Sequence, residues 1–307
     1  MRALITGSSG FIGSYLMAAL KKEGHEVCGI DRTLWGKAGE FQADIRDGAA
    51  VDHVFNAFKP DVVFHHAAQI SVAQSVSHPI YDATTNVLGT VNCLKSAVDV
   101  GVKRFIFASS GGCLYGETIM PAKEDDPKRP ESPYGVSKLC GEEYLKVFAN
   151  QYGLECIALR YSNVYGPKQN PDGEAGVVAI FSKKFVNDEV AYVYGDGLNI
   201  RDYVYIDDVV KANLLSANVD MQGRNFIPLN ISTCWPTSVG ELVVKLNDCA
   251  RDKGMAGVQT ATKPARPGDL RKSLLDNSAA KELLNWEPET WLTTGLKNTF
   301  NWFYEKR

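Results

Sequence analysis

Short apolar runs alternate with amphipathic helical patterns over the first 165 residues. Four of these runs read as buried strands, at residues 3–5, 26–30, 61–66 and 104–108. Between the first two, apolar residues recur at the spacing of one helix face, at Phe11, Ile12, Leu16, Met17 and Leu20. Strands that alternate with helices predict an α/β protein with a parallel sheet.

Beyond residue 165, the alternation of strands and helices becomes less regular. A polar loop at 167–176 precedes a helix at about 177–187 and a short strand at 190–194, and residues 201–209 return to the first pattern. We therefore expect a main domain at 1–165 plus about 202–232. About 166–201 plus 233–307 would form a smaller mixed α/β lobe that binds substrate.

Three glycines, Gly7, Gly10 and Gly13, stand between the first strand and the first helix. Gly7 permits a tight turn, Gly10 lets the backbone approach a phosphate, and Gly13 lets the helix pack close to the strand. This order predicts a Rossmann-like doubly wound parallel sheet with a dinucleotide pyrophosphate at the helix N-terminus. The alternative is an ordinary structural turn.

Acidic and small residues extend this site. Asp31 ends the second apolar run, eighteen residues after Gly13, where a carboxylate binds the ribose hydroxyls of NAD and repels the 2′-phosphate of NADP. Arg32 weakens this preference because a guanidinium can pair with a phosphate, and a solvated acid is the alternative for Asp31. Asp44 and Ile45 are placed to meet adenine, and a cofactor could pass close to the residues that follow the third run, Ala67, Ala68 and Gln69.

Tyr134 and Lys138 lie four residues apart, on one face of a helix that Ser132 can cap. A free tyrosine has a pKa of about 10, and the lysine ammonium together with oxidised NAD would favour its phenolate. Ser110, at the end of the preceding strand, could hydrogen-bond the same substrate oxygen. If the position of this hydroxyl is counted back from Tyr115 instead of forward from the strand, it falls on Gly111, which has no hydroxyl.

The composition mainly argues against other classes of protein, such as nucleic-acid-binding, membrane and secreted proteins. The 307 residues are 45% hydrophobic and 22% charged, with a formal net charge of −3, which gives no sign of a nucleic-acid or membrane surface. The first strand begins almost at Met1, so we expect no signal peptide. Seven scattered cysteines without a Cys-x-x-Cys pair indicate reduced thiols and a cytoplasmic location. His65 and His66 lack a third ligand at metal spacing, so we expect structural roles and no metal.

A set of motifs runs through nearly the whole chain: Thr6-Gly7-x-x-Gly10-Phe11-Ile12-Gly13, Asp44-Ile45, the serine-ended strand, Tyr134-x-x-x-Lys138 and Arg160-Tyr161-x-Asn163-Val164-Tyr165-Gly166-Pro167. Together they resemble the extended short-chain dehydrogenase/reductases, and within these the UDP-glucose 4-epimerase group. The resemblance implies NAD as cofactor and a UDP-sugar as substrate. It assigns further cofactor contacts to Phe11, Ile12, Asn86, Ser109 and Tyr161.

The resemblance also implies a substrate site. It assigns Arg201 and Arg266 to the pyrophosphate, Asn163 to a phosphate oxygen and Asp269 to the uridine ribose. Uracil would lie against the strand that carries Tyr192 and Tyr194, and the substrate side would include Val177 and Val178. Ser273 would stand beside the sugar C2 substituent and leave room for an N-acetyl group; the alternative is that Tyr115 or Cys113 shapes this pocket.

In the implied reaction, Tyr134 takes the proton of the sugar 4-hydroxyl while hydride passes to NAD, and the 4-ketose accepts hydride on its other face. Dehydration is disfavoured because Gly111 and Gly112 stand where related 4,6-dehydratases carry acids. A UDP-glucuronate 4-epimerase, a nucleotide-sugar decarboxylase or reductase, and a non-catalytic dinucleotide sensor are the alternatives. The resemblance also implies a homodimer through the helices at 80–100 and 134–152, which carry apolar residues beyond one core-facing stripe: Val87, Val91, Leu94, Leu139, Leu145 and Phe148. The alternative is that these residues face only their own sheet.

Overall fold

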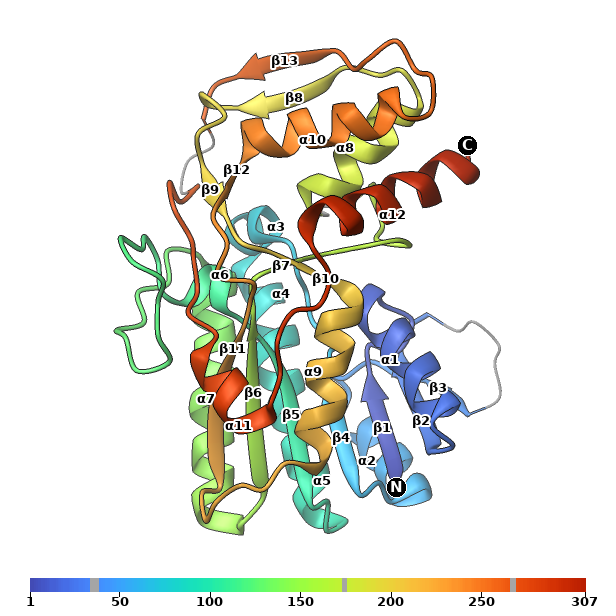
Figure 1. Cartoon of the computed structure of the whole chain (residues 1–307). Helices are drawn as coiled ribbons and strands as arrows, with labels where there is room; N and C mark the ends of the chain where they lie inside the picture. Colours follow the sequence, from blue (N-terminus) through green and yellow to red (C-terminus); the bar gives the residue numbers. More distant parts are fainter. Residues whose placement is uncertain (34–38, 173–175, 266–268) are drawn as a thin grey trace.

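A seven-stranded parallel sheet forms the centre of the computed structural model, which describes residues 1–33, 39–172, 176–265 and 269–307 (Figure 1). The strand order is β11-β6-β5-β4-β1-β2-β3, so the order along the chain reverses between β1 and β4. The strands are β1 (Arg2–Thr6), β2 (Glu26–Asp31), β3 (Glu40–Gln42), β4 (Val62–His65), β5 (Arg104–Ser110), β6 (Glu155–Tyr161) and β11 (Phe226–Ile231). This confirms the Rossmann-like doubly wound sheet, whose ligands bind where the order reverses.

Helices cover both faces of the sheet. On one face lie α1 (Phe11–Lys22) and α9 (Ile206–Asn218), and on the other lie α2 (Gly48–Phe58), α5 (Gly89–Asp99) and α7 (Pro133–Tyr152). Side chains of β1 therefore alternate between two cores: Ile5 packs with the α1 side, and Leu4 packs with the α2 side. Because both faces are buried, the strands read as continuous apolar runs.

The segment between β4 and α5 is built from short helical pieces: α3 (Val72–Ser77), α4 (Pro79–Ala83) and a π-helical turn η1 (Thr84–Leu88). Figure 1 shows these pieces stacked beside α7, and η1 runs directly into α5. The helix expected over 80–100 is thus present, with one widened turn inside it. A further short helix, α6 (Gly111–Leu114), follows β5.

The second lobe packs three helices, α8 (Val177–Val186), α10 (Val239–Arg251) and α12 (Leu292–Glu305), beside the parallel pair of β8 (Ala191–Tyr194) and β13 (Thr260–Lys263). Two small strand pairs connect it to the main domain: β7 (Asn163–Tyr165) with β10 (Tyr203–Tyr205), and β9 (Ile200–Arg201) with β12 (Thr237–Ser238). Among the described helices, none has the length and apolar character needed to span a bilayer.

One segment departs from the domain boundaries expected from the sequence. Helix α11 (Ser278–Leu284) packs against β11 and α9, on the main domain. Just beyond it, the Trp286 indole is fully buried and donates to the Asp208 carbonyl at 2.9 Å. The chain after residue 233 therefore visits the main domain again before α12 rejoins the second lobe.

Candidate active site

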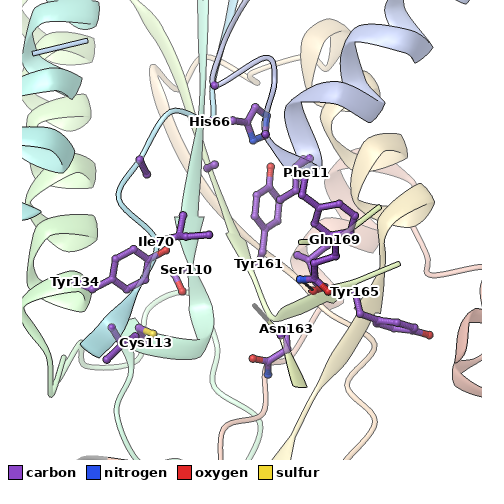
Figure 2. A pocket seen from close by; sticks show the side chains of 18 of the residues that line it. Phe11, His66, Ile70, Ser110, Cys113, Tyr134, Tyr161, Asn163, Tyr165 and Gln169 are labelled. Atoms are coloured by element: carbon purple, nitrogen blue, oxygen red, sulfur yellow. Dashed lines mark hydrogen bonds between the residues drawn. The ribbon is translucent and has the colours of Figure 1, made fainter. Parts of the chain in front are cut away.

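A cavity of about 790 Å³ runs along the carboxyl ends of the sheet strands and extends to the second lobe. Residues that follow β1, β2, β4 and β5 line the main-domain part, and residues of α8, β8 and β9 line the other part. Figure 2 shows that Ser110, Cys113 and Tyr134 gather on one side of this cavity, while Phe11, His66 and Tyr161 lie on another. The site therefore spans the two lobes.

The turn after β1 and the start of α1 have no room for a side chain at Gly7 or Gly13. Gly7 has a φ of +71°, and a Cβ on it would lie 2.7 Å from the Ala67 nitrogen. A Cβ on Gly13 would lie 2.1 Å from the Gly7 carbonyl oxygen. Helix α1 begins after Gly10, and no side chain caps its N-terminus. Because this helix end lies on the cavity, the residues present fit the pyrophosphate of a dinucleotide.

Asp31 and Arg32 lie next to this turn, on the cavity wall. The Asp31 carboxylate accepts the backbone N–H of Ser9 at 3.0 Å and that of Thr33 at 3.1 Å, which fixes its position. The Arg32 guanidinium donates to the Tyr81 hydroxyl at 2.8 Å. The acid therefore remains the group placed for a ribose, which supports NAD over NADP.

Asp44 and Ile45 also line the cavity. The guanidinium of Arg46 binds both Asp44 carboxylate oxygens, with its Nη2 2.6 Å from Oδ2. This hydrogen bonding lowers the pKa of Asp44, so the carboxylate stays charged and can accept from an adenine amino group.

The loop after β4 reaches the cavity through Ala67 and Ala68. Gln69 and Asn86, expected as cofactor contacts, are buried and are not among the residues that line the cavity. The Asn86 side chain instead binds the Gln69 backbone, accepting its N–H at 2.8 Å and donating to its carbonyl at 2.9 Å. These two residues hold the loop from behind.

Tyr134 and Lys138 meet Ser110 at the end of β5. The Ser110 hydroxyl lies beside the Tyr134 phenol (Figure 2), and Lys138 Nζ donates to the Ala108 carbonyl at 2.8 Å, 5.8 Å from the centre of the Tyr134 ring. Burial lowers the pKa of Lys138 to about 8 and raises that of Tyr134. In the protein alone, burial thus outweighs the nearby ammonium, and the expected phenolate requires the positive charge of the bound cofactor.

The two serines that end β5 have different surroundings. Ser109 Oγ is buried and donates to Glu142 Oε1 at 2.6 Å, and Glu142 in turn binds the buried Arg160 guanidinium through both oxygens. The Ser109 side chain therefore supports the strand end, and Ser109 also lines the cavity, so its predicted cofactor contact stays a prediction. Gly111 packs against Leu275, whose Cδ1 would lie 2.3 Å from a Cβ there. Ser110 remains the predicted catalytic hydroxyl.

Most predicted substrate residues line the cavity: Asn163, Val177, Val178, Tyr192, Tyr194, Arg201 and Asp269. Arg201 and Asp269 form an ion pair with each other, and Asn199 donates to the same carboxylate at 3.0 Å. Arg266 lies outside the described residues. The cavity thus presents a cation and hydrogen-bonding groups at the lobe that was expected to hold a nucleotide.

Ser273 is buried and does not itself line the cavity. Its Oγ lies 3.5 Å from the carbonyl oxygen of Gly112, and a Cβ on Gly112 would meet no atom within 4 Å. Of the two alternatives, Cys113 lines the cavity, whereas the Tyr115 hydroxyl is bound by Asn230 and Arg160. The role of Ser273 in sugar selection stays a prediction.

Residues 3–231 match the model of the NAD dependent epimerase/dehydratase family. The chain belongs to this family. A UDP-glucose 4-epimerase of Mycolicibacterium smegmatis is 42% identical over 321 residues, covering 100% of this chain and 99% of the relative. This protein is therefore an NAD-dependent enzyme of the epimerase type.

Solved structures of such epimerases superpose over the whole chain. The UDP-glucose 4-epimerase of Thermotoga maritima, solved with UDP-glucose, has a TM-score of 0.93 and 42% identity, covering 100% of this chain and 99% of that one. The UDP-glucose 4-epimerase of Thermus thermophilus, solved with NAD, has a TM-score of 0.91 and 38% identity, with 99% of each chain covered. The relatives thus cover both lobes.

Sequence reasoning missed several residues of this epimerase site. His66 and Asn199 line the cavity, and Asp82 lies buried behind it. His65 has the expected structural role, because its ring nitrogens lie 2.8 Å from Thr6 Oγ1 and 3.0 Å from Thr90 Oγ1. The described residues contain no cluster suited to a metal ion. Position after a buried strand was the one available signal for His66, and nothing local marked Asp82.

Proposed function

We propose that this enzyme interconverts the 4-epimers of a UDP-sugar through a transient 4-keto sugar. The convergence of Ser110, Tyr134 and Lys138 at the boundary between the dinucleotide turn and the second lobe carries this proposal. Bound NAD supplies the hydride acceptor and donor for sugar C4. The Arg201 guanidinium, already on the cavity wall, suits a pyrophosphate oxygen.

The residues of this chain divide the proton chemistry between them. Tyr134 accepts the proton of the sugar 4-hydroxyl and returns it after the ketone has turned, and the Ser110 hydroxyl binds the same oxygen. The charged Lys138 favours the phenolate of Tyr134. No acid follows Ser110, because the next two residues are Gly111 and Gly112. The site therefore favours epimerisation over loss of water.

A neutral hexose fits the cavity better than a uronic acid. The cationic side chains among the described lining residues are Arg32, Lys138 and Arg201. Arg32 is held by Tyr81, Lys138 by the Ala108 carbonyl, and Arg201 by Asp269 near the nucleotide end. No further lining cation in the described part of the chain is left for a C6 carboxylate. We infer UDP-glucose and UDP-galactose as substrates, and their N-acetylamino analogues through the small Ser273.

The test is to denature the purified protein, identify the released cofactor, and incubate the intact protein with separate UDP-sugars while following C4 by NMR. We expect bound NAD and C4 inversion of neutral UDP-hexoses without added cofactor. Failure to invert any UDP-sugar, or turnover that consumes added NAD(P)H, would contradict the proposal. A preference for UDP-glucuronate would overturn the choice of a neutral sugar.

We also propose a homodimer in the cytoplasm. Contrary to expectation, Leu94, Leu145 and Phe148 are buried against their own domain, so they are not available to a partner. The outer face of the same helices instead exposes other apolar side chains: Leu88, Val136, Tyr144 and Val147. These four residues are called the outer stripe below. All seven cysteines are unpaired, which supports a reducing compartment.

A further inference from the structure

A buried carboxylate joins three segments behind the cavity. Asp82 of α4 has no exposed surface. Its Oδ1 accepts Gln69 Nε2 at 2.8 Å and Asn86 Nδ2 at 3.0 Å, and its Oδ2 accepts the hydroxyl of Ser137. Gln69 belongs to the loop after β4, Asn86 to η1, and Ser137 to α7, directly before Lys138. One side chain thus links the cofactor loop to the catalytic helix.

The partners of Asp82 are connected to residues that line the cavity, both in the loop after β4 and in α7. Asn86 holds the Gln69 backbone through both its N–H and its carbonyl, and the same loop forms cavity wall at Ala67 and Ala68. On the other side, Ser137 is buried one residue before Lys138, whose ammonium lies at the cavity. Loss of the Asp82 contacts would therefore loosen the loop and the helix relative to each other.

Asp82 also brings a negative charge close to Lys138. Burial lowers the pKa of Lys138, and among the charges that oppose this effect Asp82 is the largest. The three partners of Asp82 are neutral, so they do not cancel its charge. The other titratable groups that face Lys138 are Glu142, which Arg160 binds, together with Cys113, Tyr134, His65 and His66. Burial keeps both histidines neutral by lowering their pKa values.

We propose that Asp82 is a positioning residue of this enzyme: it fastens the cofactor loop to α7 and places a negative charge behind the part of α7 that carries Lys138. The turnover part of this proposal rests on the proposed epimerase function, whereas the cofactor-retention part does not. Two substitutions separate the roles. In Asp82→Asn the amide can keep all three hydrogen bonds, because the Ser137 hydroxyl can accept as well as donate. Ser137→Ala keeps the charge and removes the connection to α7.

The first experiment measures kcat against pH for wild type and Asp82→Asn. Removing the negative charge lowers the pKa values of both Lys138 and Tyr134, so both limbs of the profile should move to lower pH. For a shift of one pKa unit, the variant should keep about one tenth of the wild-type kcat on the alkaline limb at pH 9 and should lose no kcat on the acid limb at pH 6. A profile that superimposes on that of wild type overturns the charge role, whatever the value of kcat.

The second experiment measures NAD retained after gel filtration. Ser137→Ala should lose cofactor faster than wild type with an unshifted pH profile, and wild-type retention overturns the fastening role. Asp208→Asn is the matched control: Asp208 is 3% exposed and accepts the backbone N–H groups of Glu289 and Thr290, but it does not line the cavity. This control variant should change neither the pH profile of kcat nor the amount of NAD retained. If Asp82→Asn does not fold, Ser137→Ala decides the fastening role, and Asp82→Ser replaces Asp82→Asn in the pH experiment. Wild type that lacks epimerase activity refutes the proposed function, while retention still tests Asp82.

Discussion

Tyr134 depends on its surroundings for reactivity. Burial raises its pKa, the nearby Ser110 hydroxyl opposes this rise in pKa, and Lys138 donates elsewhere, to the Ala108 carbonyl. A lysine with its pKa lowered to about 8 is charged at neutral pH and loses that charge as pH rises above 8. Because the charged lysine favours the phenolate, we expect turnover to fall on the alkaline side of that value.

Replacing Tyr134 with phenylalanine tests the assigned base. Tyr134→Phe removes the hydroxyl and little volume, so turnover should fall by about 10²- to 10⁴-fold, the usual contribution of general acid–base catalysis. NMR of the UDP-sugar measures the loss, and circular dichroism with the NAD content checks that the fold is unchanged. Near-normal turnover would reject the mechanism.

A substitution at Ser273 tests which UDP-sugars the enzyme accepts. Its side chain is buried, and its Oγ lies 3.5 Å from the Gly112 carbonyl oxygen. If this position adjoins the sugar, the larger ring of Ser273→Tyr should take up room that an N-acetyl group needs, lowering kcat/KM for N-acetylated UDP-sugars by about 10- to 200-fold. UDP-glucose and UDP-galactose serve as the internal control and should change little. The idea fails if wild type ignores N-acetylated sugars or if tyrosine leaves their turnover unchanged.

At the scale of elements, the end of β5 and the start of α1 place the chemistry. Ser109 meets Glu142 and Ser110 lies beside Tyr134, and both partners belong to α7, eight residues apart along that helix. Helix α1 can approach β1 closely because Gly13 has no side chain between its backbone and that of Gly7. Small changes in either element would displace a reacting or binding group.

Gly13→Ala tests the close approach of α1. Its Cβ would lie 2.1 Å from the Gly7 carbonyl oxygen, so the backbone has to move and NAD retention should be lost. Gly48→Ala is the control, because its Cβ would make an ordinary contact at 3.4 Å with Asn92 Oδ1. The measurement is bound NAD per protein after gel filtration. Equal retention in the two variants would exclude the steric role of Gly13.

At the scale of the whole molecule, the outer stripe crosses from η1 to α7, which pack side by side (Figure 1). Its members are 41–56% exposed, and α7 presents three of them within twelve residues at helical spacing. An apolar face of this kind marks an interaction surface. A second copy of the chain would cover it symmetrically.

Leu88→Glu combined with Val147→Glu tests this interface. Charges placed in an apolar interface are costly to desolvate, so the double variant should be a monomer at micromolar concentration by light scattering, whereas wild type should be a dimer. Val244→Glu is the control, since Val244 is an exposed apolar residue of α10 in the second lobe. A monomeric wild type would reject the dimer.

The sequence alone determined most of the helices and strands, through their hydrophobic periods, and the short motifs whose residues lie at fixed spacings. The glycine turn, the acid that ends β2 and the spacing of Tyr134 and Lys138 depend on neighbours in the chain, and in the structure these residues line one cavity. Only the tertiary structure decided that Ser109 binds Glu142, that Leu94 and Leu145 face inward, and that α11 returns to the sheet. It alone joined Asp82 to Ser137, 55 residues away. Such pairs depend on how whole elements pack, and no local period of hydrophobicity records that packing.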